Sequence, residues 1–89
     1  MEFEWDEAKN QANIEKHGFP FTVAAYILSA PHYLKSSNRG EEERWIAVGP
    51  YGQRLVAVVF TVRRDCYRII SIRRARYAEE RHYDSLHER

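Results

Sequence analysis

Two apolar segments of strand length, residues 55–63 and 66–74, dominate the hydrophobic pattern of the chain. Both are rich in β-branched residues, and only the polar pair Arg64 and Asp65 separates them. This pattern predicts an antiparallel hairpin near the centre of a sheet, with Arg64 and Asp65 at its tip. The other elements are expected to pack on this hairpin.

Helix signals flank the hairpin on both sides. Asp6 suits the N-cap of a first helix, and Gly18 suits its left-handed C-cap. A second helix is expected between Pro20 and Pro31, because apolar residues recur there at helical spacing. After Arg74 the pattern again takes the helical period and predicts a C-terminal helix.

Shorter alternating patterns predict three more strands, at residues 2–5, 32–36 and 44–49. The order is therefore strand, helix, helix, four strands, helix. It predicts an α+β fold: an antiparallel sheet of four to five strands, with the two N-terminal helices packed on one face and a C-terminal helix. At 89 residues the chain is expected to form a single domain, residues 1–89, with one modest core.

Side-chain alternation along the last predicted strand separates its two faces. Ser71 and Arg73 share one face, which we expect to be the open one, and Ile70 and Ile72 are expected to turn to the helices. With the tip at residues 64–65, Val58 should lie beside Ser71 on the partner strand. A one-residue bulge would change that pairing.

The composition argues against several classes of protein. The N-terminus is acidic and no apolar run approaches the roughly 18 residues of a membrane span, so we expect a cytoplasmic protein without a membrane partner. The one cysteine, Cys66, cannot form an intramolecular disulfide and is expected to be an ordinary strand residue. The histidines are scattered at positions His17, His32, His82 and His87, so neither a metal site nor another cofactor is expected.

Charge is divided unevenly between the two halves of the chain. Residues 1–43 contain four lysines and arginines against eight acids, whereas residues 44–89 contain ten arginines, no lysine and five acids. Arginine without lysine favours planar contacts to phosphate or carboxylate. Two interpretations stay open: the arginines bind an anion on an exposed face of the sheet, or they pair with the acidic half of the same fold.

Arginine, histidine, tyrosine and glutamate are sufficient for metal-free cleavage of RNA. In that reaction the ribose 2′-OH attacks the adjacent phosphate, which requires cations around the pentacoordinate phosphorus, a base for the hydroxyl and an acid for the leaving oxygen. Arginines meet the first requirement. His17, Glu80 and Tyr83 are the candidates for the other two.

A set of short motifs runs through most of the chain. They are Phe3-Glu4-Trp5-Asp6, Lys9, Asn13, Lys16-His17-Gly18, Phe21, Glu42-Glu43-Arg44, Thr61 with Arg63, Arg68-Ile69-Ile70-Ser71, Arg73-Arg74-Ala75 and Glu80-Arg81. In order and spacing they resemble the BrnT family of bacterial toxins, from Phe3 to about Tyr83. The resemblance implies a RelE-like ribonuclease fold and a toxin that cuts RNA and inhibits translation.

The same resemblance implies partners. A BrnA-type antitoxin with a ribbon-helix-helix DNA-binding domain is expected to neutralise the toxin. The two are expected to form a heterotetramer that contacts operator DNA only through the antitoxin and represses its own operon.

Roles for individual residues follow from the resemblance as well. Arg63 and Arg73 fall where the family presents basic residues, so they are expected to bind the phosphate or stabilise the transition state. Further expected RNA contacts are Lys16, Arg44, Arg68, Ser71 and Arg74.

Structural alternatives stay open for the same residues. In that interpretation Arg68 and Glu80 form salt bridges with neighbouring charges, Tyr83 packs the terminal helix onto the sheet, and Ser71 only fills space. A second functional class also stays open: a non-catalytic module whose arginine face docks an acidic segment of a partner in a repressor complex.

Overall fold

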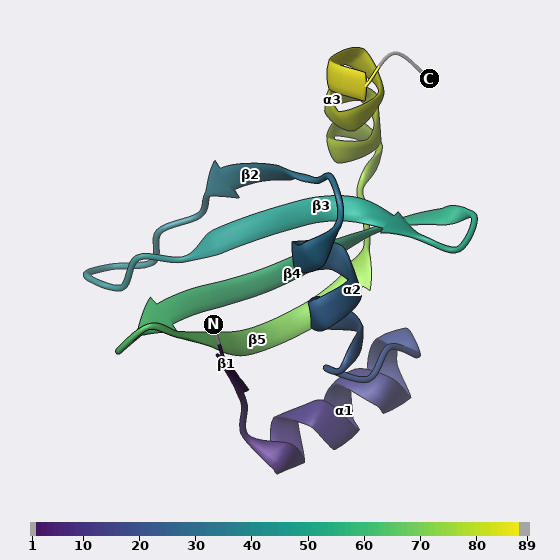
Figure 1. Ribbon diagram of the computed structural model, residues 1–89. Helices are drawn as coiled ribbons and strands as arrows, with labels where there is room; N and C mark the ends of the chain where they lie inside the picture. The colour runs from purple at the N-terminus through teal and green to yellow at the C-terminus, as the bar shows by residue number, and fades with distance from the viewer. Residues whose placement is uncertain (1, 88–89) are drawn as a thin grey trace.

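The computed structural model describes residues 2–87 and confirms the predicted α+β class and order of elements (Figure 1). The elements are β1 (Glu2–Glu4), α1 (Glu7–His17), α2 (Val23–Ser29), β2 (Tyr33–Ser36), β3 (Trp45–Tyr51), β4 (Arg54–Arg63), β5 (Cys66–Arg74) and α3 (Tyr77–His87). Among the described residues, no helix is long and apolar enough to cross a lipid bilayer.

The five strands form one sheet in the order β1-β5-β4-β3-β2. The four strands β2 to β5 are antiparallel, as predicted, but β1 pairs parallel with β5 along Glu2–Glu4. No tight turn joins β1 to β5, so nothing local imposes an antiparallel pairing. The sheet is therefore mixed, with its one parallel pair at the edge.

The hairpin of β4 and β5 turns at Arg64 and Asp65, as predicted. Both residues have positive φ, 51° and 62°, and Arg63 pairs directly with Cys66. Two successive residues with positive φ form the two-residue turn whose twist matches that of the flanking strands.

A bulge in β5 changes the predicted register. Val59 pairs with Ser71 and Phe60 with Ile69, which leaves Ile70 without a partner on β4. Val58 consequently pairs with Ile72 and not with Ser71, and Ile70 lies on the open face instead of turning to the helices. The bulge keeps Ser71 on the open face and Ile72 in the helix-side core, as predicted.

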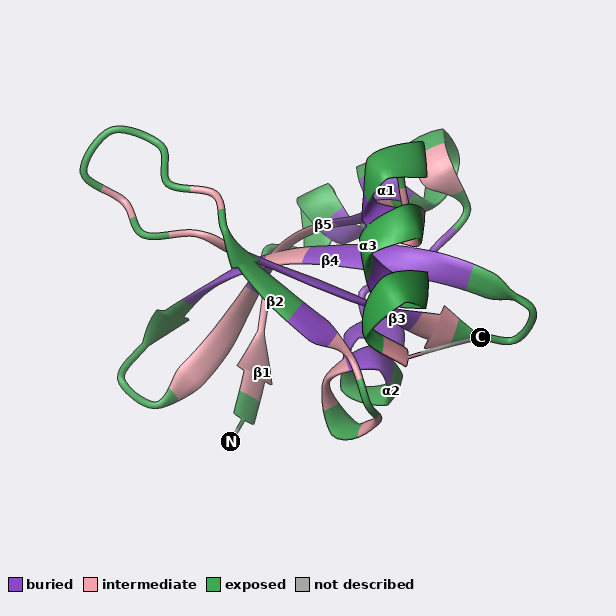
Figure 2. Cartoon of the chain, turned by 90° about the horizontal axis from the view of Figure 1, so that it is seen from above, coloured by how far each residue is buried: buried purple, intermediate pink, exposed green. Residues whose placement is uncertain are grey.

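Two core clusters occupy the two faces of the sheet. On one face α2 contributes Val23, Ala24 and Ile27, and on the other Tyr83 of α3 packs beside Tyr33 of β2. Figure 2 shows that the buried residues concentrate in the middle of β3 and β4, while the outer surface of α3 is exposed. The α2-side cluster also contains Phe19, Phe21, Ala47, Val56, Val58, Phe60, Ile69 and Ile72.

The helix α1 is attached to β5 by a buried asparagine. Its ends are as predicted: the Asp6 carboxylate accepts from the Lys9 N–H at 3.2 Å, and Gly18 has φ 81°. Between them, the Asn13 amide donates to the Ile72 carbonyl at 2.8 Å and accepts from the Ile72 N–H at 3.1 Å. Asn13 thus provides hydrogen-bond partners for the backbone of β5 at Ile72, where the short strand β1 no longer pairs with it.

Candidate functional site

A basic groove of about 440 Å³ lies on the same face of the sheet as α3, in the part of that face that the helix leaves uncovered. Its floor is formed by Ile46 of β3, Val59 of β4, and Ile70 and Ser71 of β5. Among the described residues that line it, none is an aspartate or a glutamate. The basic side chains that line it are Lys16, His17, Arg39, Arg44, Arg73 and Arg76.

These side chains converge from separate parts of the chain. Lys16 and His17 occupy the last turn of α1, where the Gly18 cap ends the helix. Arg39 comes from the loop between β2 and β3, and Arg73 comes from β5. Within residues 2–87, six basic groups and no acid line the groove. Arg44 and Arg73 are paired with carboxylates outside the lining, so the positive potential that attracts an anion comes mainly from Lys16, Arg39 and Arg76. Of the predicted site residues, the groove brings together Lys16, His17, Arg44, Ser71 and Arg73.

Arg73 does not stand free on the surface as expected, because it is paired with a buried carboxylate. Its Nη1 donates to Glu79 Oε1 at 2.8 Å and its Nη2 donates to Glu79 Oε2 at 3.0 Å. The Arg73 side chain is 14% exposed and that of Glu79 only 2%. Such a bidentate pair holds the guanidinium in one orientation at the rim of the groove.

Glu79 is held from three directions. Besides Arg73, it accepts from the backbone N–H of Arg76 at 2.8 Å and lies 3.1 Å from Lys35 Nζ of β2. Burial raises the pKa of Glu79, but the hydrogen bonds from Arg73, Arg76 and Lys35 outweigh it and lower the pKa to about 2. The carboxylate therefore stays ionised near neutral pH.

Sequence reasoning missed Glu79 and named its neighbour Glu80. A signal was available, because Glu79 precedes Tyr83 by four residues and so lies on the same face of the helix. Tyr83 was expected to pack in the alternative interpretation, and it is buried in the second core cluster. A glutamate one turn from a core tyrosine is expected to point inward and to need a cationic partner.

Arg63 lies outside the groove, at the end of β4. Its Nη2 is 3.5 Å from Glu42 Oε2, and its side chain is 56% exposed. Glu42 also accepts from Arg44 Nε, and this hydrogen bond from Arg44 is the main cause of the lowered pKa of Glu42. One carboxylate of the loop thus joins Arg63 to a lining residue of the groove.

Arg68 pairs with Glu4 of β1, its Nη1 donating to Glu4 Oε2 at 2.8 Å. The parallel pairing of β1 with β5 places these two residues opposite each other. The hydrogen bond from Arg68 is the main cause of the lowered pKa of Glu4.

The structural alternative is confirmed for three arginines, which pair with carboxylates from the acidic half of the chain: Arg44, Arg63 and Arg68. The arginines therefore do not all gather on one face of the sheet.

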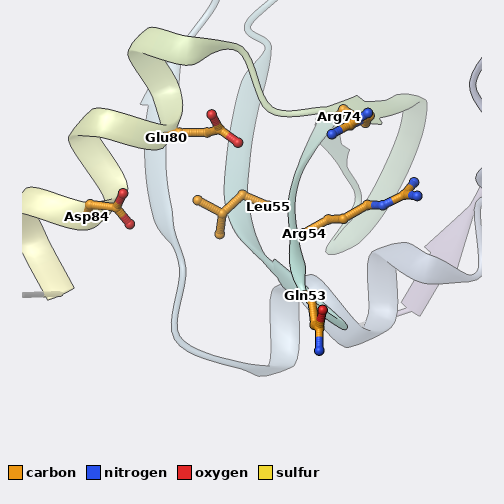
Figure 3. A pocket seen from close by; sticks show the side chains of 6 residues that line it. All are labelled: Gln53, Arg54, Leu55, Arg74, Glu80 and Asp84. Atoms are coloured by element: carbon orange, nitrogen blue, oxygen red, sulfur yellow. The ribbon is translucent and has the colours of Figure 1, made fainter. Parts of the chain in front are cut away.

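Glu80 and Arg74 line a different pocket, of about 320 Å³, together with Arg54 and Asp84 (Figure 3). This pocket lies between α3 and the start of β4 and mixes arginines with carboxylates. The structure does not bring Glu80, Arg74 or Tyr83 to the basic groove.

No metal centre is evident in residues 2–87, because no three His, Cys, Asp or Glu side chains are grouped closely enough to hold an ion. Cys66 is a half-buried residue of β5, as expected. What the groove offers is a set of cationic donors and one histidine. Guanidinium groups bind phosphate oxygens through paired N–H donors, and an imidazole can accept or donate a proton near neutral pH.

Comparison with protein families identifies the family of this chain. Residues 5–79 match the family described as "Ribonuclease toxin, BrnT, of type II toxin-antitoxin system". The match covers most of the chain and includes every lining residue of the groove. A search of curated proteins found no significant match.

Proposed function

The chain belongs to the BrnT family of toxins from type II toxin-antitoxin systems, and we propose that it is an endoribonuclease that cleaves RNA in the basic groove without a metal ion and thereby inhibits translation. The observation that carries the proposal is the convergence of six basic side chains on one groove whose described lining contains no acid, with Arg39 and Arg76 exposed there. RNA is a polyanion, and its backbone phosphates are the ligands such a groove favours.

We propose separate roles for the residues that line the groove. Arg73, held in orientation by Glu79, binds a non-bridging oxygen of the scissile phosphate. Arg39 and Arg76 are exposed and contact phosphates on either side. Arg44, Lys16 and Ser71 complete the set of RNA contacts.

The reaction proposed is attack of the ribose 2′ oxygen on the adjacent phosphorus. The bond from phosphorus to the 5′ oxygen breaks, and the products are a 2′,3′-cyclic phosphate and a 5′-hydroxyl. One proton leaves the 2′-OH and one is added to the 5′ oxygen. His17 carries out one of these transfers and solvent water the other, while the guanidinium of Arg73 stabilises the charge on the phosphorane.

The family implies an antitoxin partner. We propose a BrnA-type antitoxin with a ribbon-helix-helix domain, bound in a heterotetramer that reaches operator DNA only through the antitoxin. The site of action is the cytoplasm, where the toxin meets RNA that is being translated.

The test is cleavage of a fluorescent RNA by purified protein in the presence of EDTA, with the product ends mapped. We expect cyclic phosphate ends, and His17→Asn is expected to lower kcat on the order of 100-fold or more. Arg54→Ala, which removes an exposed arginine outside the groove, is the matched control and should cleave like the unaltered protein. Intact RNA under all conditions, or equal activity of the His17→Asn protein, would contradict the proposal.

A second candidate function is a non-catalytic module that docks an acidic segment of its partner. Arg39 and Arg76 favour it, because both are exposed in the groove and a guanidinium binds a carboxylate as well as a phosphate. Induced expression with and without the neighbouring antitoxin gene separates the two candidates. Arrested growth with fragmented RNA supports the nuclease, while normal growth with intact RNA supports the docking module.

A further inference from the structure

We infer that Glu79 is a positioning residue, which fixes the guanidinium of Arg73 for the phosphate in the groove. Glu79 does not line the groove and acts only through Arg73. This inference rests on the proposed function and extends it to a residue with no direct access to RNA.

The contacts of Arg73 leave part of its guanidinium available. Its Nη1 donates to Glu79 and to the Arg74 carbonyl, at 2.8 and 3.2 Å, and its Nη2 donates to Glu79 at 3.0 Å. These hydrogen bonds, which are those found within the described residues, use three of the five N–H groups of the Arg73 guanidinium. The two remaining N–H groups can bind an anion in the groove that Arg73 lines.

Glu79 is itself immobilised, which makes it a suitable anchor. Its side chain is 2% exposed, and it accepts from the Arg76 N–H at 2.8 Å just before α3 begins. Lys35 Nζ of β2 lies 3.1 Å away on the other oxygen. Three parts of the fold therefore determine where the carboxylate lies, and the bidentate geometry passes that placement on to Arg73.

An opposite role for the same contact can be tested. A carboxylate paired with Arg73 also cancels its charge, so Glu79 could only mask the arginine. Masking predicts that removal of the carboxylate strengthens RNA binding and leaves turnover equal or faster. Positioning predicts slower turnover with binding retained, because the charge is still present but its orientation is lost.

The experiment compares kcat and KM for RNA cleavage by the unaltered protein and by the Glu79→Gln protein. We expect kcat to fall on the order of 10- to 100-fold while KM changes by less than about threefold. Glu41→Gln removes the same charge from the exposed loop beside the groove and should leave both constants unchanged. Unchanged or faster turnover by the Glu79→Gln protein would overturn the inference.

A second variant covers the case in which Glu79→Gln fails to fold. Arg73→Lys keeps the positive charge and the ion pair with Glu79 but loses the planar, two-pronged geometry. We expect the same fall in kcat, whereas turnover equal to that of the unaltered protein would overturn the inference. If the unaltered protein itself does not cleave RNA, the proposed function fails and the inference fails with it. If it cleaves and both variants match it, only the inference fails.

Discussion

Replacement of Asn13 by alanine should destabilise the protein far more than an ordinary substitution in a helix. The Asn13 amide donates to the carbonyls of Phe19 and Ile72, both at 2.8 Å, and accepts from the Ile72 N–H at 3.1 Å. Asn13 is buried, so alanine leaves these backbone groups without partners. A buried group that loses its hydrogen bond costs about 1–3 kcal/mol. With partial access of water at the sheet edge, we expect a total loss of about 3 kcal/mol.

The measurement is urea unfolding at constant m-value, with thermal unfolding as a second readout. A loss of about 3 kcal/mol corresponds to a Tm lower by roughly 10–20 °C in a domain of this size. Gln11→Ala is the control, because Gln11 lies on the exposed side of the same helix and its side chain bonds to Glu7. It should cost less than about 0.5 kcal/mol. An Asn13→Ala loss below about 1 kcal/mol would refute the role assigned to this side chain.

Three further changes test other parts of the structure. Gly18→Ala should lower the free energy of unfolding in urea by about 1 kcal/mol, because φ is 81° at this position although the space around it is open. An unchanged free energy would mean that the helix end rearranges freely. Gly49→Ala should lower the free energy of unfolding by about 1–3 kcal/mol for a different reason. The Cβ of the new alanine would lie 3.2 Å from His32 Cβ and 3.3 Å from Ile27 Cγ2, which is too close. An unchanged stability would show that α2 can shift away from β3. The contribution of Glu79 to stability should be complete above about pH 4.5 and disappear as the pH falls toward 2, because its pKa is lowered from 4.5 to about 2 in the folded protein. The difference in free energy of unfolding between the unaltered and Glu79→Gln proteins should therefore decrease by about 3 kcal/mol as the pH falls from about 5 to about 2. A difference that stays constant with pH would contradict the lowered pKa.

Most of the fold was predictable because its signals are local. The Asp6 cap, the Gly18 cap and the turn at Arg64 and Asp65 depend on residues close together in the chain. The bulge at Ile70 was not predictable, because strand alternation alone does not show where one strand gains a residue over its partner.

The candidate site was predictable only in part. Five of the predicted residues come together: Lys16, His17, Arg44, Ser71 and Arg73. Arg63 lies elsewhere, beside the Glu42 carboxylate that it shares with Arg44, and Arg68 lies beside Glu4. The family resemblance placed Arg63 and Arg68 among the RNA contacts, but it does not show which carboxylates of the chain lie beside them. Which acid each arginine meets depends on loops and strands that are distant in sequence.

The sequence by itself determined which segments become helices and strands, because hydrophobic period, caps and turn residues act over a few positions. Tertiary structure alone decided that Arg73 is the arginine that meets the Glu79 carboxylate, and that α1, the β2–β3 loop and β5 enclose one basic groove. The physical reason is that helix and strand signals depend on residues a few positions apart in the sequence. Ion pairs and grooves depend instead on the distances between segments that are far apart in the sequence and that only the packed core brings together.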